Sequence, residues 1–581
     1  MSAQELITEH LDLWMEAVTK KSTSGRGSNG KIELTGVKKL RELILELAVK
    51  GRLVNQNPNA EPADVLLARL RDERLELEKS KKIKKRLKTS ESTNVDELTA
   101  LPSNWCWSQL GEVAFKLTDG SHNPPKDSGR GIPMLSSQNV NFGRIDFECP
   151  SRYLTLEDFV KEDARTKARS GDVLLTIVAS LGRAAVVPPE APQFALQRSV
   201  AVIGTPIDSD FLAYQLIAPK CLHYYDTHGK GTAQKGIYLG KLAVMPIAVP
   251  PLEEQQRIVQ KVDELMALCD QLEQQTCDQL AAHETLVDTL LSTLTQSENA
   301  TELAENWTRL ATHFDTLFTT EQSIDKLKQS ILQLAVMGRL VEQDAGDEPA
   351  DMLVSEILHS RDRLARTERM KTKADDSVSP SDQYIDTPSS WAWIRLGNMA
   401  KFIDYRGKTP TKISSGKRLI TAKNIRRGFI DLEPEEFISE ADYASWMTRG
   451  FPRRGDLLFT PEAPLGNAAI VDLNEEFALA QRAICFQWHT PEVSKFMLLQ
   501  VLAHAFQQQL IENATGMTAT GIKAAKLKEI PVTIPPRQEQ HRIVQKVDEL
   551  MALCDQLKGR LNQASETRCQ LAEALVSQAV N

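Results

Sequence analysis

The sequence lacks the features that mark membrane, secreted and metal-binding proteins. It contains no run of about eighteen apolar residues, so no transmembrane helix is expected. Its eight cysteines form no CxxC pair, and its ten histidines add no metal-ligand spacing. The opening residues, "MSAQELITEHLDLW", are acidic and amphipathic and do not resemble a secretion signal. We therefore expect a protein of the reducing cytoplasm.

Motifs for catalysis are incomplete. The stretch Gly25–Ile32 has the glycines and lysine of a phosphate-binding loop, but Ile32 replaces the hydroxyl residue that would bind magnesium. "HNPPK" at His122–Lys126 resembles the Asn-Pro-Pro-aromatic element of adenine methyltransferases. Lys126 stands where that element needs an aromatic ring to stack on a flipped base. With no Ser/His/Asp constellation either, we predict a binding protein and not an enzyme.

What the sequence does contain is a tandem duplication. Sixteen residues, "RIVQKVDELMALCDQL", occur at Arg257–Leu272 and return unchanged at Arg542–Leu557. "LELAVKGRLV", starting at Leu45, returns as "LQLAVMGRLV", starting at Leu332, and "GDVLLTIVASLGRAAVV" at Gly171 corresponds to "GDLLFTPEAPLGNAAIV" at Gly455. The chain is thus two copies of one unit, roughly residues 1–290 and 291–581.

The repeated segment is predicted to be a long helix with a coiled-coil seam. Its apolar residues alternate in steps of four and three. They are Ile258, Val262, Leu265, Cys269 and Leu272 in the first copy, and Ile543, Val547, Leu550, Cys554 and Leu557 in the second. About forty residues at 1.5 Å each give a rod of roughly 60 Å. We expect the seams to pack against each other or against the "LELAVKGRL"-type helices, with Val262, Leu265, Val547 and Leu550 buried between the two long helices.

Between the helices of each copy the pattern predicts a mixed module. "GDVLLTIVA" and "RAAVVP" are short β-branched runs bounded by glycine and proline, which is typical of strands. The predicted class is α/β (α+β), with two tandem α/β modules separated and joined by two long antiparallel helices. The predicted divisions are a helical region at 1–100, a module at 101–250, a helical region at 251–386, a module at 387–536 and a helix at 537–581.

The two copies share little beyond turn residues at Leu117–Arg144 and Phe402–Arg427, and the loops of each module are the candidate recognition surface. The first loop is Leu117–Gly131, the second is Ser136–Arg144 or Thr421–Phe429, and the third is Thr227–Tyr238 or Asn513–Lys523. They combine glycine with hydrogen-bonding side chains, which suits contact with a phosphate or a base edge. The candidate DNA-binding residues are Ser121, His122, Asn123, Lys126, Gln138, Asn139, Lys230, Gln234, Lys235, Tyr405, Arg406, Lys408, Lys412, Lys423, Asn424, Arg426, Arg427, Thr518 and Lys523.

Charge supports the same surface. The whole chain carries −8, which argues against a nucleic-acid partner unless positive charge is concentrated locally. From Lys401 to Arg427, nine cations stand against Asp404 alone, a local charge of +8. For this patch the alternative is a solvated loop face. For the divergence of the two modules the alternative is a recent duplication with relaxed constraint on surface loops. The basic run Lys79–Lys88 could likewise contact DNA or a partner, or form a solvated helix face.

The order of these elements resembles a known family. Each module ends in "PPLEEQQRIV" or "PPRQEQHRIV" before its long helix, and the first also carries "GDVLLT" at Gly171, "LGRAAVV" at Leu181 and "QR" at Gln197. Over nearly the whole chain this arrangement resembles the specificity subunit (HsdS) of type I restriction–modification enzymes. The second module departs from the pattern at Pro461–Pro464, so contact residues do not transfer directly between modules.

The resemblance implies a pseudo-twofold protein with two target-recognition domains, each reading half of a bipartite DNA sequence, and helices that fix the spacer. It implies two methyltransferase subunits and restriction subunits as partners. S-adenosylmethionine, ATP and magnesium would then belong to those partners, with no cofactor in this chain. Identical surface residues in both long helices, such as Gln260, Lys261, Asp263 and Glu264, favour a duplicated partner. The alternatives are a coiled-coil scaffold binding non-DNA ligands and a degenerate adenine methyltransferase.

Overall fold

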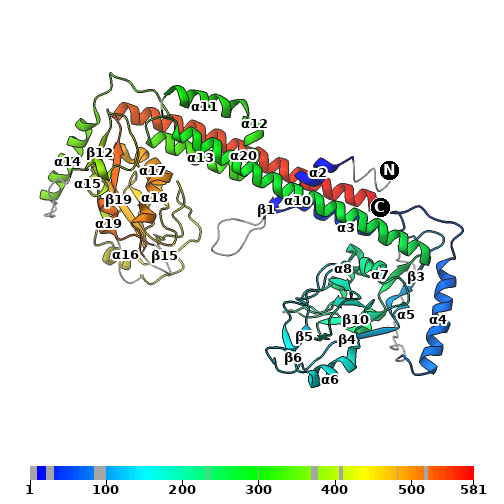
Figure 1. The fold of residues 1–581 in the computed structure, drawn as a ribbon. Coiled ribbons are helices and arrows are strands. Elements are labelled where there is room, and N and C mark those ends of the chain that lie inside the picture. Colours follow the sequence, from blue (N-terminus) through cyan, green and yellow to red (C-terminus); the bar gives the residue numbers. More distant parts are fainter. Residues whose placement is uncertain are drawn as a thin grey trace. The chain divides into compact units, whose positions relative to one another are not determined.

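The chain forms two compact units (Figure 1). The computed structural model describes residues 9–20, 32–83, 100–231, 234–298, 300–367, 377–404, 410–480, 482–515 and 521–580. One unit comprises Met1–Leu280 with Ala564–Asn581, and the other comprises Ala281–Gln563. Within this described part, no helix is both long and apolar enough to cross a membrane. The phosphate-loop-like stretch Gly25–Ile32 lies outside it except for Ile32.

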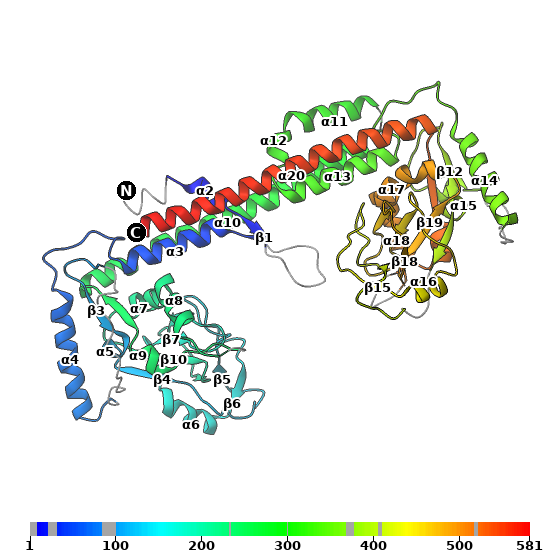
Figure 2. The ribbon, with the colours of Figure 1, turned by 180° about the vertical axis from the view of Figure 1, so that it is seen from behind.

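The module of the first unit consists of small sheets covered by short helices (Figures 1 and 2). Its central antiparallel sheet has the order β4 (Lys116–Asp119), β10 (Val200–Gly204), β7 (Val173–Thr176) and β8 (Ala184–Val186). The other sheets are β6 (Arg152–Leu154), β5 (Ile132–Leu135), β9 (Ala195–Leu196), and β3 (Cys106–Gln109) with β11 (Pro246–Val249). The helices are α5 (Leu110–Val113), α6 (Leu156–Thr166), α7 (Ser209–Ile217), α8 (Pro219–His228) and α9 (Leu239–Ala243). The two strands predicted from the sequence are thus present as β7 and β8, and every residue of β7 is buried.

The second module repeats this strand order. Its central sheet runs β13 (Ala400–Asp404), β19 (Ile484–Trp488), β16 (Leu457–Phe459) and β17 (Ala468–Ile470). The other sheets are β15 (Phe437–Ile438), β14 (Lys417–Ile420), β18 (Phe477–Leu479), and β12 (Ala392–Arg395) with β20 (Pro531–Ile534). The helices are α15 (Leu396–Met399), α16 (Glu440–Trp446), α17 (Ser494–Leu502), α18 (His504–Glu512) and α19 (Ala524–Glu529). The predicted pair of α/β modules is confirmed.

The two long helices begin where the sequence predicts, directly after a Pro-Pro pair. They are α10 (Leu252–Gln296), with 45 residues, and α20 (Arg537–Val580), with 44. Proline has no N–H to leave unsatisfied, which suits the start of a helix. The remaining helices outside the modules are α2 (Leu11–Glu16), α3 (Thr35–Val49), α4 (Ala63–Lys79), α11 (Ala300–Thr312), α12 (Phe314–Leu317), α13 (Glu321–Val336) and α14 (Ala350–Thr367).

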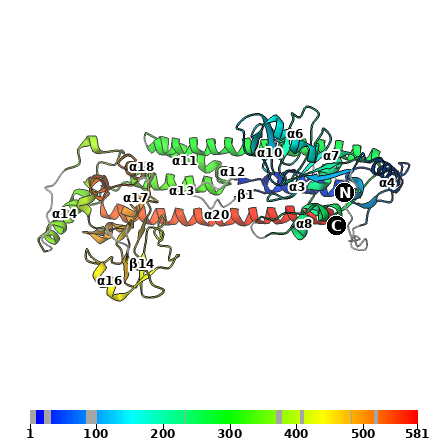
Figure 3. The same ribbon diagram turned by 90° about the horizontal axis from the view of Figure 1, so that it is seen from below.

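In the first unit, α3 packs against the first part of α10 and the last part of α20 (Figure 3). The contacts are Arg41–Asp270 (2.6 Å), Arg257 Nη1 to Asn55 O (3.0 Å), Lys39–Glu573 (3.9 Å) and Arg52 Nη1 to Ala579 O (3.3 Å). From residue 41 to residue 55 the partners in α10 go down from 270 to 257, so α3 is antiparallel to α10. From residue 39 to residue 52 the partners in α20 go up from 573 to 579, so α3 is parallel to α20. The two long helices therefore run antiparallel in this unit.

The second unit exchanges the roles of the long helices. Here α13 packs against the last part of α10 and the first part of α20. The contacts are Lys326–Asp288 (2.7 Å), Arg339 Nη1 to Ser297 O (2.6 Å), Lys558–Asp325 (3.0 Å) and Arg542–Asp347 (2.6 Å). α13 is thus parallel to α10 and antiparallel to α20. The predicted antiparallel arrangement of the long helices is confirmed within each unit.

The two seams do not pack against each other. The first, at Ile258, Val262, Leu265, Cys269 and Leu272, is 0–6% exposed and shares one core with α3 and with Ala572 of α20. In the second, Ile543, Val547 and Cys554 are buried and Leu550 and Leu557 partly buried, in a core with α13 and the Val287–Leu294 part of α10. Of the two arrangements expected from the sequence, packing of seam against seam is wrong and packing against the "LELAVKGRL"-type helices is confirmed. Each seam faces the short helix of its own copy and the far part of the other long helix. A third helix satisfies a heptad pattern as well as a second one does.

A buried carboxylate joins each module to its helices. Glu254 is 0% exposed and accepts a hydrogen bond from Gln56 Nε2 at 2.6 Å. Glu539, 1% exposed, accepts from Gln343 Nε2 at 2.5 Å and from Trp391 Nε1 at 3.0 Å. Burial raises the pKa of both carboxyls. One side chain thus ties together the start of a long helix, the segment after a short helix and, in the second copy, the residue that precedes the first strand of the module.

We predict that Leu265→Asp destabilises the helical bundle of the first unit by about 3 kcal/mol or more. Leu265 is 5% exposed, so the new carboxylate would be buried without a partner. Hydrogen exchange should show lost amide protection in α3 and in residues 252–280, with α13 unchanged. Gln260→Asp, at an exposed position of the same helix, is the control and should leave all protection intact. Native protection in α3 of Leu265→Asp would contradict this packing.

Candidate nucleic-acid interface

All three loops of the first module connect to one turn, Gln197–Ser199. The connecting hydrogen bonds are Arg198 N to Ser121 O (2.9 Å) for the first loop, Ser137 N to Ser199 Oγ (3.0 Å) for the second, and Ile177 N to Ser199 O (2.9 Å) with Ile237 N to Ile177 O (2.9 Å) for the third. Segments separated by some sixty residues in the sequence are brought to one place by β9 and β10, which flank the turn. The three loops therefore form a single candidate surface.

Three of the predicted contact residues are buried and hold the loops together instead. Ser121 is 6% exposed and forms a β-bridge with Gln197. Asn139, 1% exposed, accepts from Ser136 N at 3.0 Å and donates to the carbonyls of Asp146 and Cys149. Asn424 repeats this arrangement in the second module, with Thr421 N, Asp431 O and Pro434 O as its partners. The assignment of all three as base-contacting residues is corrected. Burial keeps Ser121 from a ligand, and the amides of Asn139 and Asn424 use both donors and the acceptor inside the loop, which leaves none for a base.

The other predicted residues of the first loop are at the surface. His122 Nε2 lies 2.7 Å from Asp119 Oδ2, and Arg165 Nη2 contacts Asp119 Oδ1 at 2.6 Å. One carboxylate thus orients two side chains, of which the sequence indicated only His122. Asn123 and Lys126 are exposed. The first loop and Arg165 beside it thus offer hydrogen-bond donors and acceptors to a ligand.

The third loops are closed by a repeated backbone bridge. Lys230 pairs with Gly236 in the first module and Thr515 with Gly521 in the second, with each glycine also bridged to the turn after the buried strand β7 or β16. Lys230 and Gln234 are exposed, and Lys235 forms an ion pair with Asp226. Lys523 is exposed at the start of α19. Thr518 lies outside the described residues.

The cationic stretch Lys401–Arg427 is less positive in the fold than in the sequence. The ion pairs are Lys412–Glu436 (2.7 Å), Arg418–Glu475 (2.7 Å), Lys417–Glu476 (2.9 Å) and Arg426–Asp431 (3.0 Å). Residues 428–440 add five carboxylates and no cation, so residues 401–440 carry +3, nine cations against six acids. The +8 counted over residues 401–427 is therefore partly offset in the fold by carboxylates that lie outside that stretch. Arg427 donates to Leu502 O at 3.0 Å, and burial lowers its pKa.

Some cations of that stretch stay at the surface or fall outside the described residues. Lys423 is exposed on the second loop, in the place that Gln138 has in the first module, where it is exposed as well. Tyr405, Arg406 and Lys408 lie outside the described residues. Of the run Lys79–Lys88, the described lysines 79, 81 and 82 are exposed at the end of α4, and the rest is likewise not described. Among the described residues, cations that could contact DNA phosphates are therefore present as single exposed side chains and not as one continuous basic patch.

Arg198 is a candidate contact residue that the sequence reasoning did not select. It is exposed in the turn where the loops connect, and its backbone N donates to the first loop. Its counterpart Arg482 has a left-handed backbone (φ 65°) and contacts Glu462, beside the bridge that closes the third loop. The signal was available: "QR" recurs at Gln197 and at Gln481, 284 residues apart.

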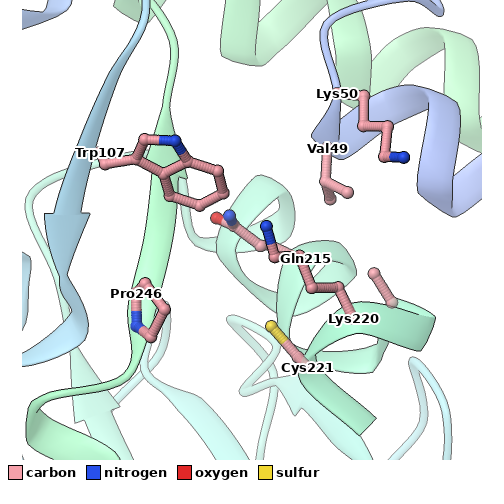
Figure 4. A pocket seen from close by; sticks show the side chains of 8 residues that line it. Val49, Lys50, Trp107, Gln215, Lys220, Cys221 and Pro246 are labelled. Carbon is pink, nitrogen blue, oxygen red and sulfur yellow. The ribbon is translucent and has the colours of Figure 1, made fainter. Parts of the chain in front are cut away.

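A small pocket where α3 meets the first module is a packing joint and not a reaction site (Figure 4). Lys220 Nζ lies 4.2 Å from the ring centre of Trp107, and burial raises the pKa of the Cys221 thiol to about 12, so the thiol stays protonated. In the second unit Tyr384 contacts the counterpart ring of Trp393, edge-on at 5.4 Å. The lining residues are Val49, Lys50, Trp107, Gln215, Ala218, Lys220, Cys221 and Pro246.

Comparison with known proteins agrees with the duplicated plan. The model of the type I restriction modification DNA specificity domain matches residues 102–282 and 388–566, one match for each module. The EcoAI and EcoEI type I restriction enzyme specificity subunits of Escherichia coli are each 35% identical to this chain over 603 aligned positions, covering 100% of both proteins.

Solved structures are more distant. The HsdS subunit from Thermoanaerobacter tengcongensis is 17% identical with a TM-score of 0.37, covering 84% of this chain and 99% of that one. A chain from a study of complex assembly and conformational transition in the type I R-M system is 18% identical with a TM-score of 0.45, covering 83% and 99%. The two domain matches and the full-length relatives show that the chain belongs to the family of type I restriction–modification specificity subunits.

Proposed function

We propose that this chain recognises DNA for a type I restriction–modification complex, each module reading one half of a bipartite target. One observation carries the proposal: the same backbone bridges and the same buried asparagines hold loops whose exposed side chains differ. Gln138 corresponds to Lys423, and Tyr238 to Lys523, all four exposed. A constant scaffold with different exposed groups suits two readers of different base sequences. A scaffold protein for other ligands would not need loops that share one internal structure and differ in their exposed side chains.

The long helices are the proposed docking sites for methyltransferase subunits. Asp263 and Asp548 occupy the same exposed position in the two identical segments. Tyr214 donates to Asp263, but its counterpart is Leu499, which has no hydroxyl to donate. Contacts within the chain therefore do not account for the identity of the two carboxylates. A partner bound twice would account for it, because two equal partners need two equal surfaces.

In this proposal the partner subunits carry out the catalytic reactions and bind the cofactors. S-adenosylmethionine serves the two methyltransferase subunits, while ATP and magnesium serve the restriction subunits, and this chain contributes binding alone. Its surroundings are the cytoplasm, where the DNA is. His122, the first residue of the methyltransferase-like stretch, lies 2.7 Å from Asp119, and Lys126 at the end of that stretch provides no ring for stacking.

The first test reads the target from methylated genomic DNA of cells that express the chain with its methyltransferase subunit. We expect a bipartite sequence. Exchange of residues 105–250 for the module of another family member should change one half and leave the other as it was, because β3 and β11 close the module at Cys106 and Val249. Exchange of residues 391–535 should change the opposite half. Both halves changing after one exchange would refute separate readers.

A second test asks whether the long helices set the spacer. Both cross from one unit to the other, α10 at Leu280–Ala281 and α20 at Gln563–Ala564. Three heptads inserted at both points leave the contacts of each unit intact and add roughly 32 Å. This is close to the 34–36 Å of one DNA turn, so both modules again face the same side of the duplex.

With the matched insertions, methylation should move to sites with unchanged halves and a spacer longer by about nine or ten base pairs. The control inserts three heptads in α10 alone, which puts the second unit out of step with α20 and should abolish methylation. If the matched variant methylates only at the original spacing, the helices do not set the distance.

A further inference from the structure

The second loop of each module ends in a rigid four-residue turn. Asn141 N donates to Arg144 O at 2.8 Å in one module, and Arg426 N donates to Phe429 O at 3.0 Å in the other. The central glycines, at φ 70° and 97°, donate to β8 at 2.9 Å and to β17 at 2.8 Å. Buried Asn139 and Asn424 brace the base of each loop, as described above. The backbone of each turn is therefore held from both sides, which fixes the positions from which its side chains extend.

Each turn exposes one phenylalanine. Phe142 is 58% exposed and Phe429 is 60% exposed, and these are the two most exposed phenylalanines among the described residues. Single exposed apolar residues are common on protein surfaces. Two on the same rigid turn of a duplicated module are a pattern that calls for a partner.

The two phenylalanines are not equivalent positions. The first turn has the order Phe-Gly-Arg at 142–144, and the second has Arg-Gly-Phe at 427–429, so phenylalanine and arginine have exchanged places around the glycine. Each turn keeps both residue types, but the phenyl group precedes the glycine in the first turn and follows it in the second. A surface that two copies of one protein partner share would be the same in both modules, as the exposed face of the long helices is. Two different DNA half-sites require a difference of this kind.

We propose that Phe142 and Phe429 are apolar wedges that enter the DNA, each at the half-site of its own module. The proposal rests on the proposed function and deepens it by naming the contact. A phenyl ring on a rigid tip can insert at a base step and partly unstack it, and cations beside it can contact the backbone phosphates. In the first turn the cation is Arg144, which is exposed. In the second it is Arg426, which is 46% exposed and orients on Asp431 at 3.0 Å.

The test uses the complex of this chain with its methyltransferase subunit, carrying Phe142→Ala or Phe429→Ala. The probes are duplexes that contain the full target sequence identified from the methylated genomic DNA, only one half of that sequence, or neither half. Phe142→Ala should weaken binding about tenfold to the full target and to the half read by the first module. It should leave binding to the other half unchanged. Phe429→Ala should do the reverse, and module exchange identifies which half is which.

The matched control is Leu156→Ala, which removes a 67% exposed apolar side chain from α6 of the same first module. It should bind every probe as the unaltered complex does. Insertion itself is read from 2-aminopurine placed along each half-site, away from the methylated adenine. Its fluorescence should rise on binding of the unaltered complex and rise less with the alanine variant of that module.

Three outcomes would overturn the wedges: unchanged affinity in both alanine variants, an unchanged 2-aminopurine signal, or loss of the co-purifying methyltransferase subunit, which would make the turns protein contacts. Failure of the proposed function is a separate result. It would appear as an unaltered complex that binds the full target no better than a duplex with neither half.

Discussion

The buried carboxylates Glu254 and Glu539 are the constraint on which the rest of each unit depends. A carboxylate removed from water is stable only where donors surround it, and here the donors come from segments far apart in the sequence. In the second copy Gln343 and Trp391 donate to Glu539, so the long helix, the end of the short helix and the module start must be in place together. Both carboxylates lie in the first turn of a long helix, where free N–H groups favour negative charge.

The glycine that ends each short helix belongs to the same junction. Gly51 and Gly338 have φ near +68°, and a Cβ on either would lie within about 3 Å of the nearby tryptophan, Trp105 or Trp391. The left-handed residue turns the chain so that Gln56 or Gln343 reaches its glutamate. The repeated "GRLV" motif is thus explained by backbone conformation and close packing. Its role is to place the module on the helix at a defined angle within each unit.

In the modules, buried loop side chains hold the loops in place, and exposed loop side chains are free to contact a ligand. Ser121, Asn139 and Asn424 are polar loop residues that the fold uses internally, whereas Gln138 and Lys423, one position before each asparagine, are exposed. A substitution of a buried loop residue therefore alters the shape of the loop, whereas a substitution of its exposed neighbour alters the group that the loop offers to a ligand. The loops can diverge in specificity because buried side chains and backbone bridges hold their shape.

How much followed from the sequence depended on the range of the interactions. The duplication, the long helices after Pro-Pro, the buried strands and the family were all predictable, because identity, periodicity and turn residues are local signals. The partner of each seam was not, since a heptad pattern shows that a face is apolar and not what covers it. The unpaired positive charge at residues 401–427 was overestimated because some carboxylates that pair with these cations are some sixty residues away, at Glu475 and Glu476. Arg198 was overlooked for the same reason: only the tertiary structure joins its turn to two loops directly and to the third through Ile177.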